Sequence, residues 1–391
     1  MGNAYLGGWR RRVFWTLIAL AIPALIAVCV ESWRQMQIAS SRAELDDACE
    51  RARVDVLGGM TPAQFTQSRV KGTNGYERLR KLAEAIDNAP PIGPGTFEAA
   101  DDSEPFTPMG VSKVLGVQEW PRLKRDPPDA EKARLFLAAT EAWSAELEEI
   151  SRCDVIAQVI HDSDTYGDLL GGDSLSWLQV HLRSLWFMLA RANSHALLGD
   201  GDSAARQLLT VARLYSLMKV PLYELQLNTR AWGFAAVLNL ALQWIKDRRI
   251  AAMQLKALTS FDMDCEPLLP VAANGVMASK ILFAQWVQEW PSEVWFGWAR
   301  PDIEDSPFDD GDRQNKYTRG IRYREGWTTG LRTYAAQVLE LQDQSPPYIV
   351  RTADQQGLVM SANLQAASTR IHSQQVEIDA VRAELLKLMA K

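Results

Sequence analysis

An apolar run near the start of the chain places the strongest constraint on its fold. From position 13 to position 30 only Thr16 carries a polar side chain, and about 20 helical residues cross a hydrocarbon core of about 30 Å. The run is longer than the apolar region of a secretory signal, and residues 31–34 form a poor cleavage site. Residues 13–30 are therefore predicted to be a retained transmembrane anchor, with cleavage of the run or lipidation at Cys29 as the alternative. Three tryptophans stand where interfacial aromatic side chains belong: Trp9, Trp15 and Trp33.

The charges beside this run predict its orientation. Arg10, Arg11 and Arg12 precede the run, whereas residues 31–37 contain one Glu and one Arg. The positive-inside rule keeps the arginine-rich side in the cytoplasm. We therefore expect a cytoplasmic tail at residues 1–12, contact with membrane lipid through the anchor, and a body outside the cell membrane.

The residues after the anchor are predicted to be helical, because strand signals are scarce and apolar residues recur three and four apart. In the membrane-proximal region, residues 31–88, one helix is expected to end at Gly58-Gly59 and another to begin at Thr61-Pro62. A short amphipathic helix is expected at 76–88. Residues 89–128 are rich in proline and glycine, which predicts an extended connector.

The main body is expected at residues 129–345 as a series of helical hairpins. Two hairpins align at an offset of 47 residues, which matches Asp200 with Asp247 and Gln207 with Gln254. Such a period is typical of TPR-like or HEAT-like arrays, in which stacking closes the apolar face of each hairpin. The predicted fold class is therefore all-α. The helices expected in the body lie at 129–160, 174–198, 203–219, 222–245, 250–261, 266–290 and 317–344.

The last segment, residues 363–391, carries a heptad pattern. Leu364, Ile371, Ile378 and Leu385 recur every seven residues, which predicts a coiled-coil-like helix. This helix is expected to associate with a second copy or to dock on the body. Ile371 and Ile378 are accordingly interaction candidates.

Charge and cysteine content limit the possible partners. The net charge is −6 although three arginines stand near the start, so the body is acidic and nucleic acid is not an expected partner. Outside the anchor, Cys49, Cys153 and Cys265 allow at most one disulfide, and unpaired buried thiols are the simpler interpretation.

One segment resembles a known group of proteins. The sequence LARANSHALLGDGDSAARQLLTVARLYSLMKVP, followed by EPLLPVAANGVMASKILFAQW, resembles uncharacterised single-pass proteins of planctomycete bacteria with a helical body. The shared features are the Gly199-Asp200 turn and the helix bearing Arg213-Leu214. The resemblance covers roughly residues 175–350 and implies no activity, no cofactor and no functional residue.

Two clusters of side chains are candidate sites. His161, Asp162 and Asp164 form the tightest group of metal-ligating residue types, although a polar helix end with capping carboxylates is the favoured explanation of them. The stretch WVQEWPSEVWFGW brings together Trp286, Trp290, Trp295 and Trp298, as a ligand shelf, a membrane-touching patch or a core corner. A core corner is the favoured interpretation, and either of the other two makes these tryptophans interaction candidates.

These observations favour a membrane-anchored, non-enzymatic helical scaffold of the cell envelope that holds a protein partner or self-associates. No cofactor is expected, and no nucleophile elbow or phosphate loop is present. The alternative is an envelope enzyme, such as a metal-assisted hydrolase that uses His161 and nearby Asp residues.

Overall fold

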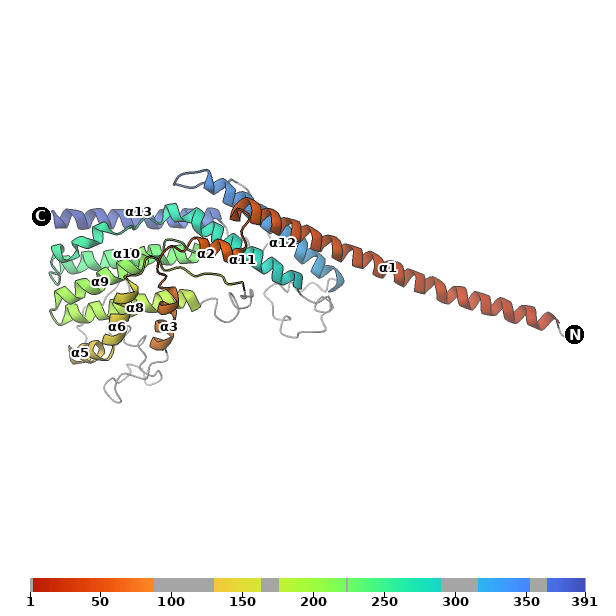
Figure 1. The fold of residues 1–391 in the computed structure, drawn as a ribbon, viewed down its shortest axis with the longest axis horizontal. Coiled ribbons are helices and arrows are strands. Elements are labelled where there is room, and N and C mark those ends of the chain that lie inside the picture. The colour runs from red at the N-terminus through yellow and green to blue at the C-terminus, as the bar shows by residue number, and fades with distance from the viewer. Residues whose placement is uncertain are drawn as a thin grey trace. The chain divides into compact units, whose positions relative to one another are not determined.

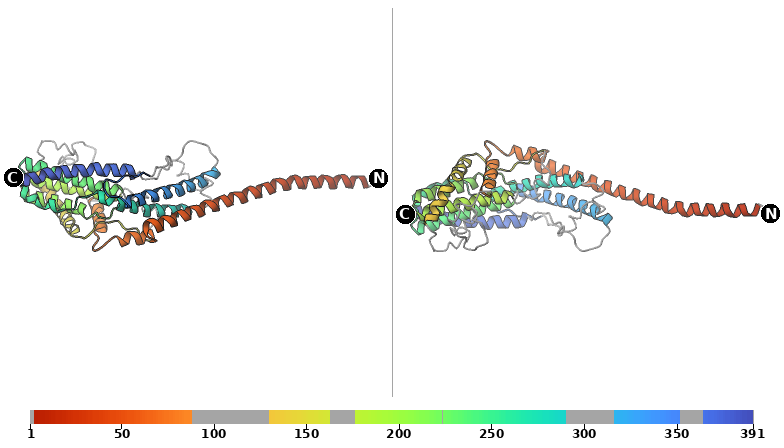
Figure 2. Two further views of the ribbon diagram at one scale, coloured as in Figure 1. Left: turned by 90° about the horizontal axis from the view of Figure 1, so that it is seen from above. Right: turned by 90° about the horizontal axis from the view of Figure 1, so that it is seen from below.

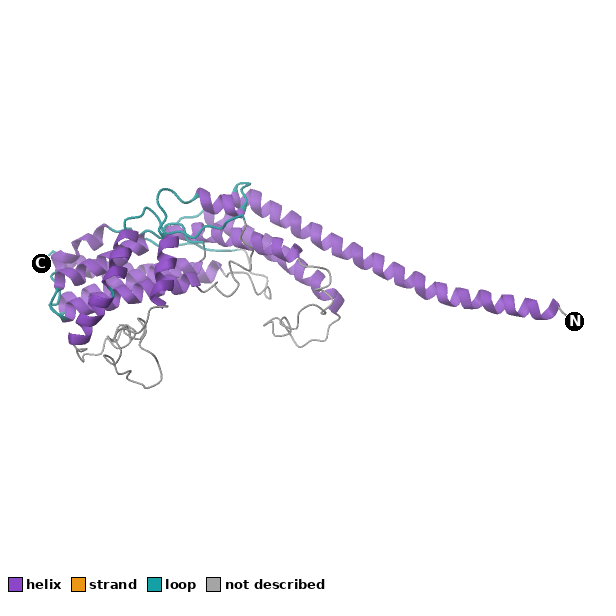
Figure 3. Ribbon diagram, turned by 60° about the horizontal axis from the view of Figure 1, so that its bottom comes forward, coloured by secondary structure: helices purple, strands orange, loops and turns teal. Residues whose placement is uncertain are grey.

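The structure is a computed structural model that describes residues 3–87, 130–162, 176–222, 224–289, 316–351 and 364–390. Helices dominate these residues (Figure 3). Within the described ranges, the only β-structure is one isolated bridge between Asn74 and Val155. The predicted all-α class is confirmed. The expected connector at 89–128 lies outside the described residues.

The chain divides into two compact units. The first comprises Met1–Arg51 and Ala284–Arg332, and the second comprises Ala52–Phe283 and Thr333–Lys391. The helices are labelled in Figure 1. Their bounds are α1 (Asn3–Leu57), α2 (Pro62–Ser68), α3 (Tyr76–Asp87), α5 (Ala130–Ala139), α6 (Glu141–Ile150), α8 (Ser176–Leu197), α9 (Gly201–Ser216), α10 (Glu224–Lys246), the 3-10 helices η1 (Ala252–Ser260) and η2 (Glu266–Leu268), α11 (Leu269–Glu289), α12 (Lys316–Gln342) and α13 (Leu364–Met389).

In the first unit, polar contacts join α1 to the end of α11 and to the start of α12. The Gln288 amide donates hydrogen bonds to the Arg42 carbonyl (2.8 Å) and to Asp46 Oδ1 (3.0 Å). The buried Arg324 guanidinium donates to Ser41 Oγ at 3.3 Å, and burial lowers the pKa of Arg324 to about 10. On α1 these contacts involve residues 41–46, which follow the expected anchor at 13–30.

The ends of α1 and α2 follow the local signals in the sequence. Gly58 and Gly59 have φ of 63° and 81°, a conformation that glycine adopts without steric cost, and α1 ends before them as predicted. Thr61 caps α2 through a reciprocal pair of hydrogen bonds with Gln64. The amphipathic helix expected near residues 76–88 is α3. The apolar residues of one face of this helix are buried: Leu79, Leu82, Ala83 and Ile86.

The single long helix expected at 129–160 was wrong. Arg191 on α8 donates through Nη1 to the Leu137 carbonyl (2.9 Å) and to Thr140 Oγ1 (2.6 Å). In an uninterrupted α-helix the Leu137 carbonyl would accept the amide of Glu141. Because Arg191 takes this acceptor, the helix stops at Ala139 and a second helix, α6, begins at Glu141.

After α6 the chain is extended instead of helical. The Asn74 amide holds this segment by donating to the Ala157 carbonyl (2.8 Å) and accepting from the Ala157 amide (3.1 Å). Further along, the Ile160 amide donates to Thr66 Oγ1 at 3.0 Å. The side chains of Asn74 and Thr66 thus form hydrogen bonds with backbone groups that a neighbouring strand would pair in a sheet.

The first predicted hairpin is present, and the second is only partly so. α8 and α9 are joined by a turn in which Gly199 has φ of 80° and Asp200 caps α9 by accepting from the Ser203 amide. The segment expected as an α-helix at 250–261 is instead the 3-10 helix η1. The aligned residues also differ in role, since Gln207 bonds to Ser144 within the core, whereas Gln254 bonds to Asp202 near the surface.

α10 is the central helix of the second unit, with α9 on one side and α13 on another (Figures 1 and 2). At Gly233 the backbone of α10 lies so close to α9 that an added Cβ would be 2.6 Å from the Tyr215 ring. Tyr215 and Phe234 are both buried there, with ring centroids 6.2 Å apart. A side chain at position 233 would therefore push the two helices apart.

The heptad residues of α13 form one buried stripe against the body. Leu364, Ile371, Ile378 and Leu385 are each at most 2% exposed, and α13 packs mainly on α10. The Gln375 side chain accepts the amide of Cys265 at 2.9 Å. Docking on the body is therefore the arrangement that the structure has.

One helical segment in the described part of the chain is long and apolar enough to cross a membrane: Glu266–Gln285. Of this segment 67% is buried within the protein, as the core helix of a soluble protein would be. This segment is therefore weak evidence for a membrane span. Part of the expected anchor at 13–30 has side chains outside the described set, although its backbone belongs to α1.

Replacing Gly233 by alanine is expected to destabilise the protein by about 1–3 kcal/mol, because overpacking strains a filled interface. The free energy of unfolding, measured by urea titration with circular dichroism, tests this. Combining Gly233→Ala with Tyr215→Leu should show a favourable coupling, since the smaller side chain leaves room for the methyl group. Strict additivity of the two changes would contradict the proposed steric cause.

Replacing Ile371 and Ile378 together by aspartate is expected to destabilise the second unit by at least about 3 kcal/mol. The change would bury two unpaired carboxylates against α10. Limited proteolysis and thermal unfolding should both report the loss.

The matched control places two aspartates on the exposed side of the same helix, at Val376 and Leu386, which are 56% and 47% exposed. This control should unfold close to the unmodified protein. Equal losses in the two double variants would mean that α13 is not docked through its heptad stripe.

Candidate functional site

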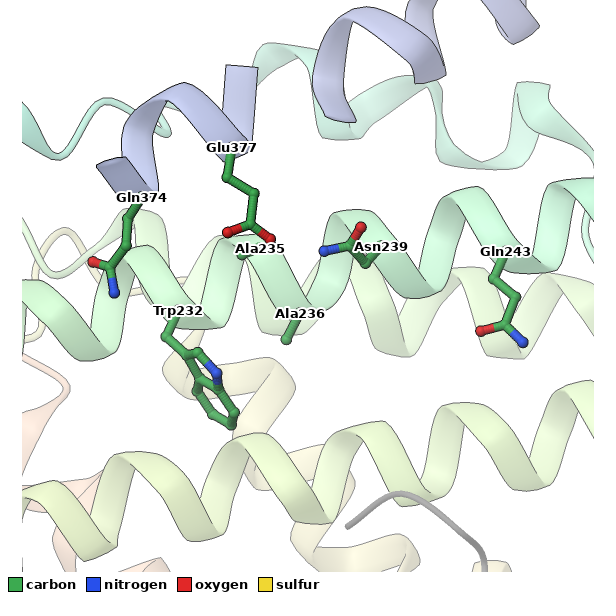
Figure 4. A pocket seen from close by; sticks show the side chains of 7 residues that line it. All are labelled: Trp232, Ala235, Ala236, Asn239, Gln243, Gln374 and Glu377. Carbon is green, nitrogen blue, oxygen red and sulfur yellow. The ribbon is translucent and has the colours of Figure 1, made fainter. Parts of the chain in front are cut away.

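A partly open groove lies between α10 and α13 in the second unit. Its volume is about 490 Å³, within the range of roughly 300–1,000 Å³ that small-molecule sites occupy. Figure 4 shows that α10 supplies most of the lining while two side chains reach it from α13. The lining residues are Trp232, Ala235, Ala236, Asn239, Gln243, Gln374 and Glu377.

The spacing of the polar residues on α10 explains why they meet in the groove. Trp232, Asn239 and Gln243 are separated by seven and four residues, so they share one face of the helix. They are half-buried, whereas most other residues of α10 are buried in the core. Ala235 and Ala236 lie between them, and their small side chains leave the space that forms the floor of the groove.

The chemistry of the lining is polar and nearly uncharged. Three amide side chains, an indole and one carboxylate face the cavity, and no Lys or Arg is among them. Amides both donate and accept hydrogen bonds, and the indole combines a flat apolar face with one donor. This set suits a neutral ligand that carries several hydroxyl or amide groups.

Among the lining residues, Gln374 on α13 has an amide oxygen, Oε1, that is buried without a hydrogen-bond partner in the described part of the protein. Buried acceptors normally have a partner, which a ligand or an ordered water can supply. The groove thus has unused acceptor capacity.

Arg230, two residues before Trp232, fixes the position of α10. It is completely buried, and its guanidinium donates to the Met218 carbonyl (3.0 Å) and to the Asp262 carbonyl (2.8 Å). It also lies over the Phe234 ring, 5.3 Å from the centroid. Because three segments meet at one guanidinium, α10 cannot rotate about its axis without breaking these bonds.

Neighbouring Cys265 is held as a neutral thiol. Burial raises its pKa to about 11, and the adjacent Arg230 opposes this effect only in part. Burial likewise raises the pKa of Cys49 to about 12, with Asp46 adding to the effect. All four cysteines of the chain are free in the structure. Buried neutral thiols such as Cys49 and Cys265 are poor nucleophiles.

The predicted metal-ligating cluster is not assembled in the described residues. His161 and Asp162 are exposed at the end of the extended segment, and Asp164 lies outside the described residues. No group of three or more His, Cys, Asp or Glu side chains within the described ranges is placed to hold a metal ion.

The other predicted interaction residues divide into two groups. Trp286 belongs to α11 but its side chain is outside the described set, as are Trp290, Trp295 and Trp298 altogether. Ile371 and Ile378 are buried, and they contact the body instead of facing solvent.

Sequence reasoning missed the groove, although one signal was present. Within the apolar stretch 224–246, polar residues recur on a single helical face, which an entirely buried helix would not need. No sequence signal indicated the two lining residues of α13. Gln374 and Glu377 are polar residues beside the heptad stripe, where solvent-exposed side chains are expected.

Comparison with known proteins gives no match: no protein-family model, no curated protein and no solved structure is similar to this chain. The function must therefore be argued from the residues and their arrangement.

Replacing Arg230 by methionine is expected to destabilise the protein by roughly 2–4 kcal/mol, because buried carbonyl groups lose their donors. Arg230→Lys should also be destabilising, since one ammonium cannot replace the planar fork that reaches separate carbonyls. The control is Arg206→Met at an exposed position of α9, which should change the unfolding midpoint little. Retention of full stability in both Arg230 variants would remove this residue as the clamp of α10.

Proposed function

We propose that this protein is a membrane-anchored, non-enzymatic helical scaffold whose body lies outside the cytoplasmic membrane and holds a partner. The observation that carries the proposal is the exposed apolar surface of α1. Large apolar side chains between positions 22 and 30 are more than half exposed: Ile22, Leu25, Ile26, Val28 and Val30.

An exposed surface of this kind on a long helix needs a non-aqueous environment. Exposed apolar patches mark sites that contact a membrane or another protein, because water solvates them poorly. α1 continues as a helix through residues 13–30 although Pro23 lies inside it. Trp15 and Trp33, which are 59% and 60% exposed, bracket this surface at positions suited to the lipid headgroups.

The orientation is proposed from charge. Arg10, Arg11 and Arg12 precede the apolar surface, and positively charged flanks are retained on the cytoplasmic side. The second unit would then lie outside the membrane, attached through the remainder of α1.

A scaffold role fits the construction of the second unit. Its buried arginines, Arg191 and Arg230, donate to backbone carbonyls and so hold helices together instead of facing a reaction site. The α8–α9 hairpin and the α10–η1 pair that follows it are proposed to be two members of a helical-hairpin array of the TPR-like or HEAT-like kind. Such arrays present elongated surfaces to partner proteins.

The orientation is tested with a reporter enzyme that is active only outside the cytoplasm, fused after Lys391. The fusion is expected to be active, and the full-length protein should fractionate with membranes. Replacing Arg10, Arg11 and Arg12 by glutamine should lower the active fraction, because the charge bias at the first flank is then lost.

The control variant changes Arg42, Arg51 and Arg53, which lie beyond the anchor in α1, to glutamine and should leave orientation nearly unchanged. Full activity of a cytoplasm-specific reporter in the unmodified protein would contradict the orientation. Recovery of the whole body as a soluble cleaved product would contradict the anchor.

A further inference from the structure

We propose that the groove between α10 and α13 binds a neutral saccharide of two or three sugar units. The inference goes beyond the scaffold role and does not depend on the membrane orientation. It rests on the composition, size and unused hydrogen-bonding capacity of the groove.

Trp232 supplies the flat surface that a sugar ring needs. The axial C–H groups on one face of a pyranose are apolar, and the indole offers a rigid apolar plane at small cost in conformational entropy. Trp232 is half-buried, so part of its ring faces the groove while the rest packs on the helices. Figure 4 shows it projecting from the same stretch of α10 that carries Asn239.

The amides supply the polar contacts. Asn239 and Gln243 follow Trp232 along α10, and Gln374 enters from α13 near Trp232. A sugar hydroxyl is both donor and acceptor, which matches an amide side chain. The buried Gln374 Oε1 has no hydrogen-bond donor. After a small rotation of the amide, a sugar hydroxyl in the groove could donate to it.

The charge of the lining excludes other small ligands of this size. Phosphates and carboxylates are recognised by Arg, Lys or clustered backbone amides, and the lining contains none of these cationic side chains. Glu377 would repel an anion, whereas a carboxylate accepts well from a pair of sugar hydroxyls. A purely apolar ligand would leave three amides without partners.

The position of the groove also permits a chain longer than its cavity. The lining residue Glu377 is exposed, so the groove opens to solvent on the side of α13 and sugar units can extend beyond the enclosed part. A disaccharide is the smallest ligand that reaches both Trp232 and Asn239.

The test uses the full-length protein in a detergent without a sugar headgroup, titrated with N,N′-diacetylchitobiose and with maltotriose. Isothermal titration calorimetry and saturation-transfer NMR measure binding. Saturable binding of at least one of the two probes is expected. Trp232→Ala should weaken it by about tenfold or more, while Trp232→Phe, which keeps a flat ring, should weaken it much less.

Gln374→Leu tests the opposite wall and should also weaken binding, since it removes the amide while keeping the bulk. The matched control is Val376→Ala, an exposed position on the same helix outside the lining, which should bind normally. Thermal unfolding of each variant separates lost binding from lost folding, and Trp232→Phe keeps the test valid if the alanine variant unfolds. Absence of saturable binding of both probes, or equal binding by Trp232→Ala and the unmodified protein, would overturn the proposal.

Discussion

The second unit depends on α10 being covered along its length by side chains from other helices. α9 approaches it at Gly233, where nothing larger than hydrogen fits beside Tyr215. α13 covers another face with a stripe of aliphatic residues whose members are almost fully buried. Arg230 then fixes the rotation of the helix. The lining of the groove is the part of α10 that these contacts leave uncovered.

Local signals in the sequence predicted the elements whose ends are determined by their own residues. Glycines with positive φ end α1 and α8, and Thr61 caps α2. The heptads of α13 predicted both the helix and its buried stripe, because a seven-residue repeat places its apolar residues on one face. In these elements the neighbouring sequence determines where the helix ends or which of its faces is apolar, whereas the docking of α13 on α10 depends on both helices.

Other features could not be predicted because distant residues decide them. The break at Thr140 is made by Arg191, which takes a carbonyl that the helix would otherwise use. The extended segment after α6 is held by Asn74 and Thr66, far earlier in the chain. The candidate groove needs α10 and α13 side by side, so a pattern on either helix alone cannot indicate it. The sequence instead drew attention to His161, which is exposed.

The place of α13 in the chain order has a consequence for how the protein is made. The helix that covers α10 is synthesised after α11 and α12, so α10 leaves the ribosome long before its covering stripe exists. Contacts between segments so far apart in sequence form late, because closing the intervening loop costs chain entropy. Until then the aliphatic side chains of α10 remain accessible to chaperones and to other nascent chains. Folding of the second unit therefore finishes with the arrival of residues 364–389.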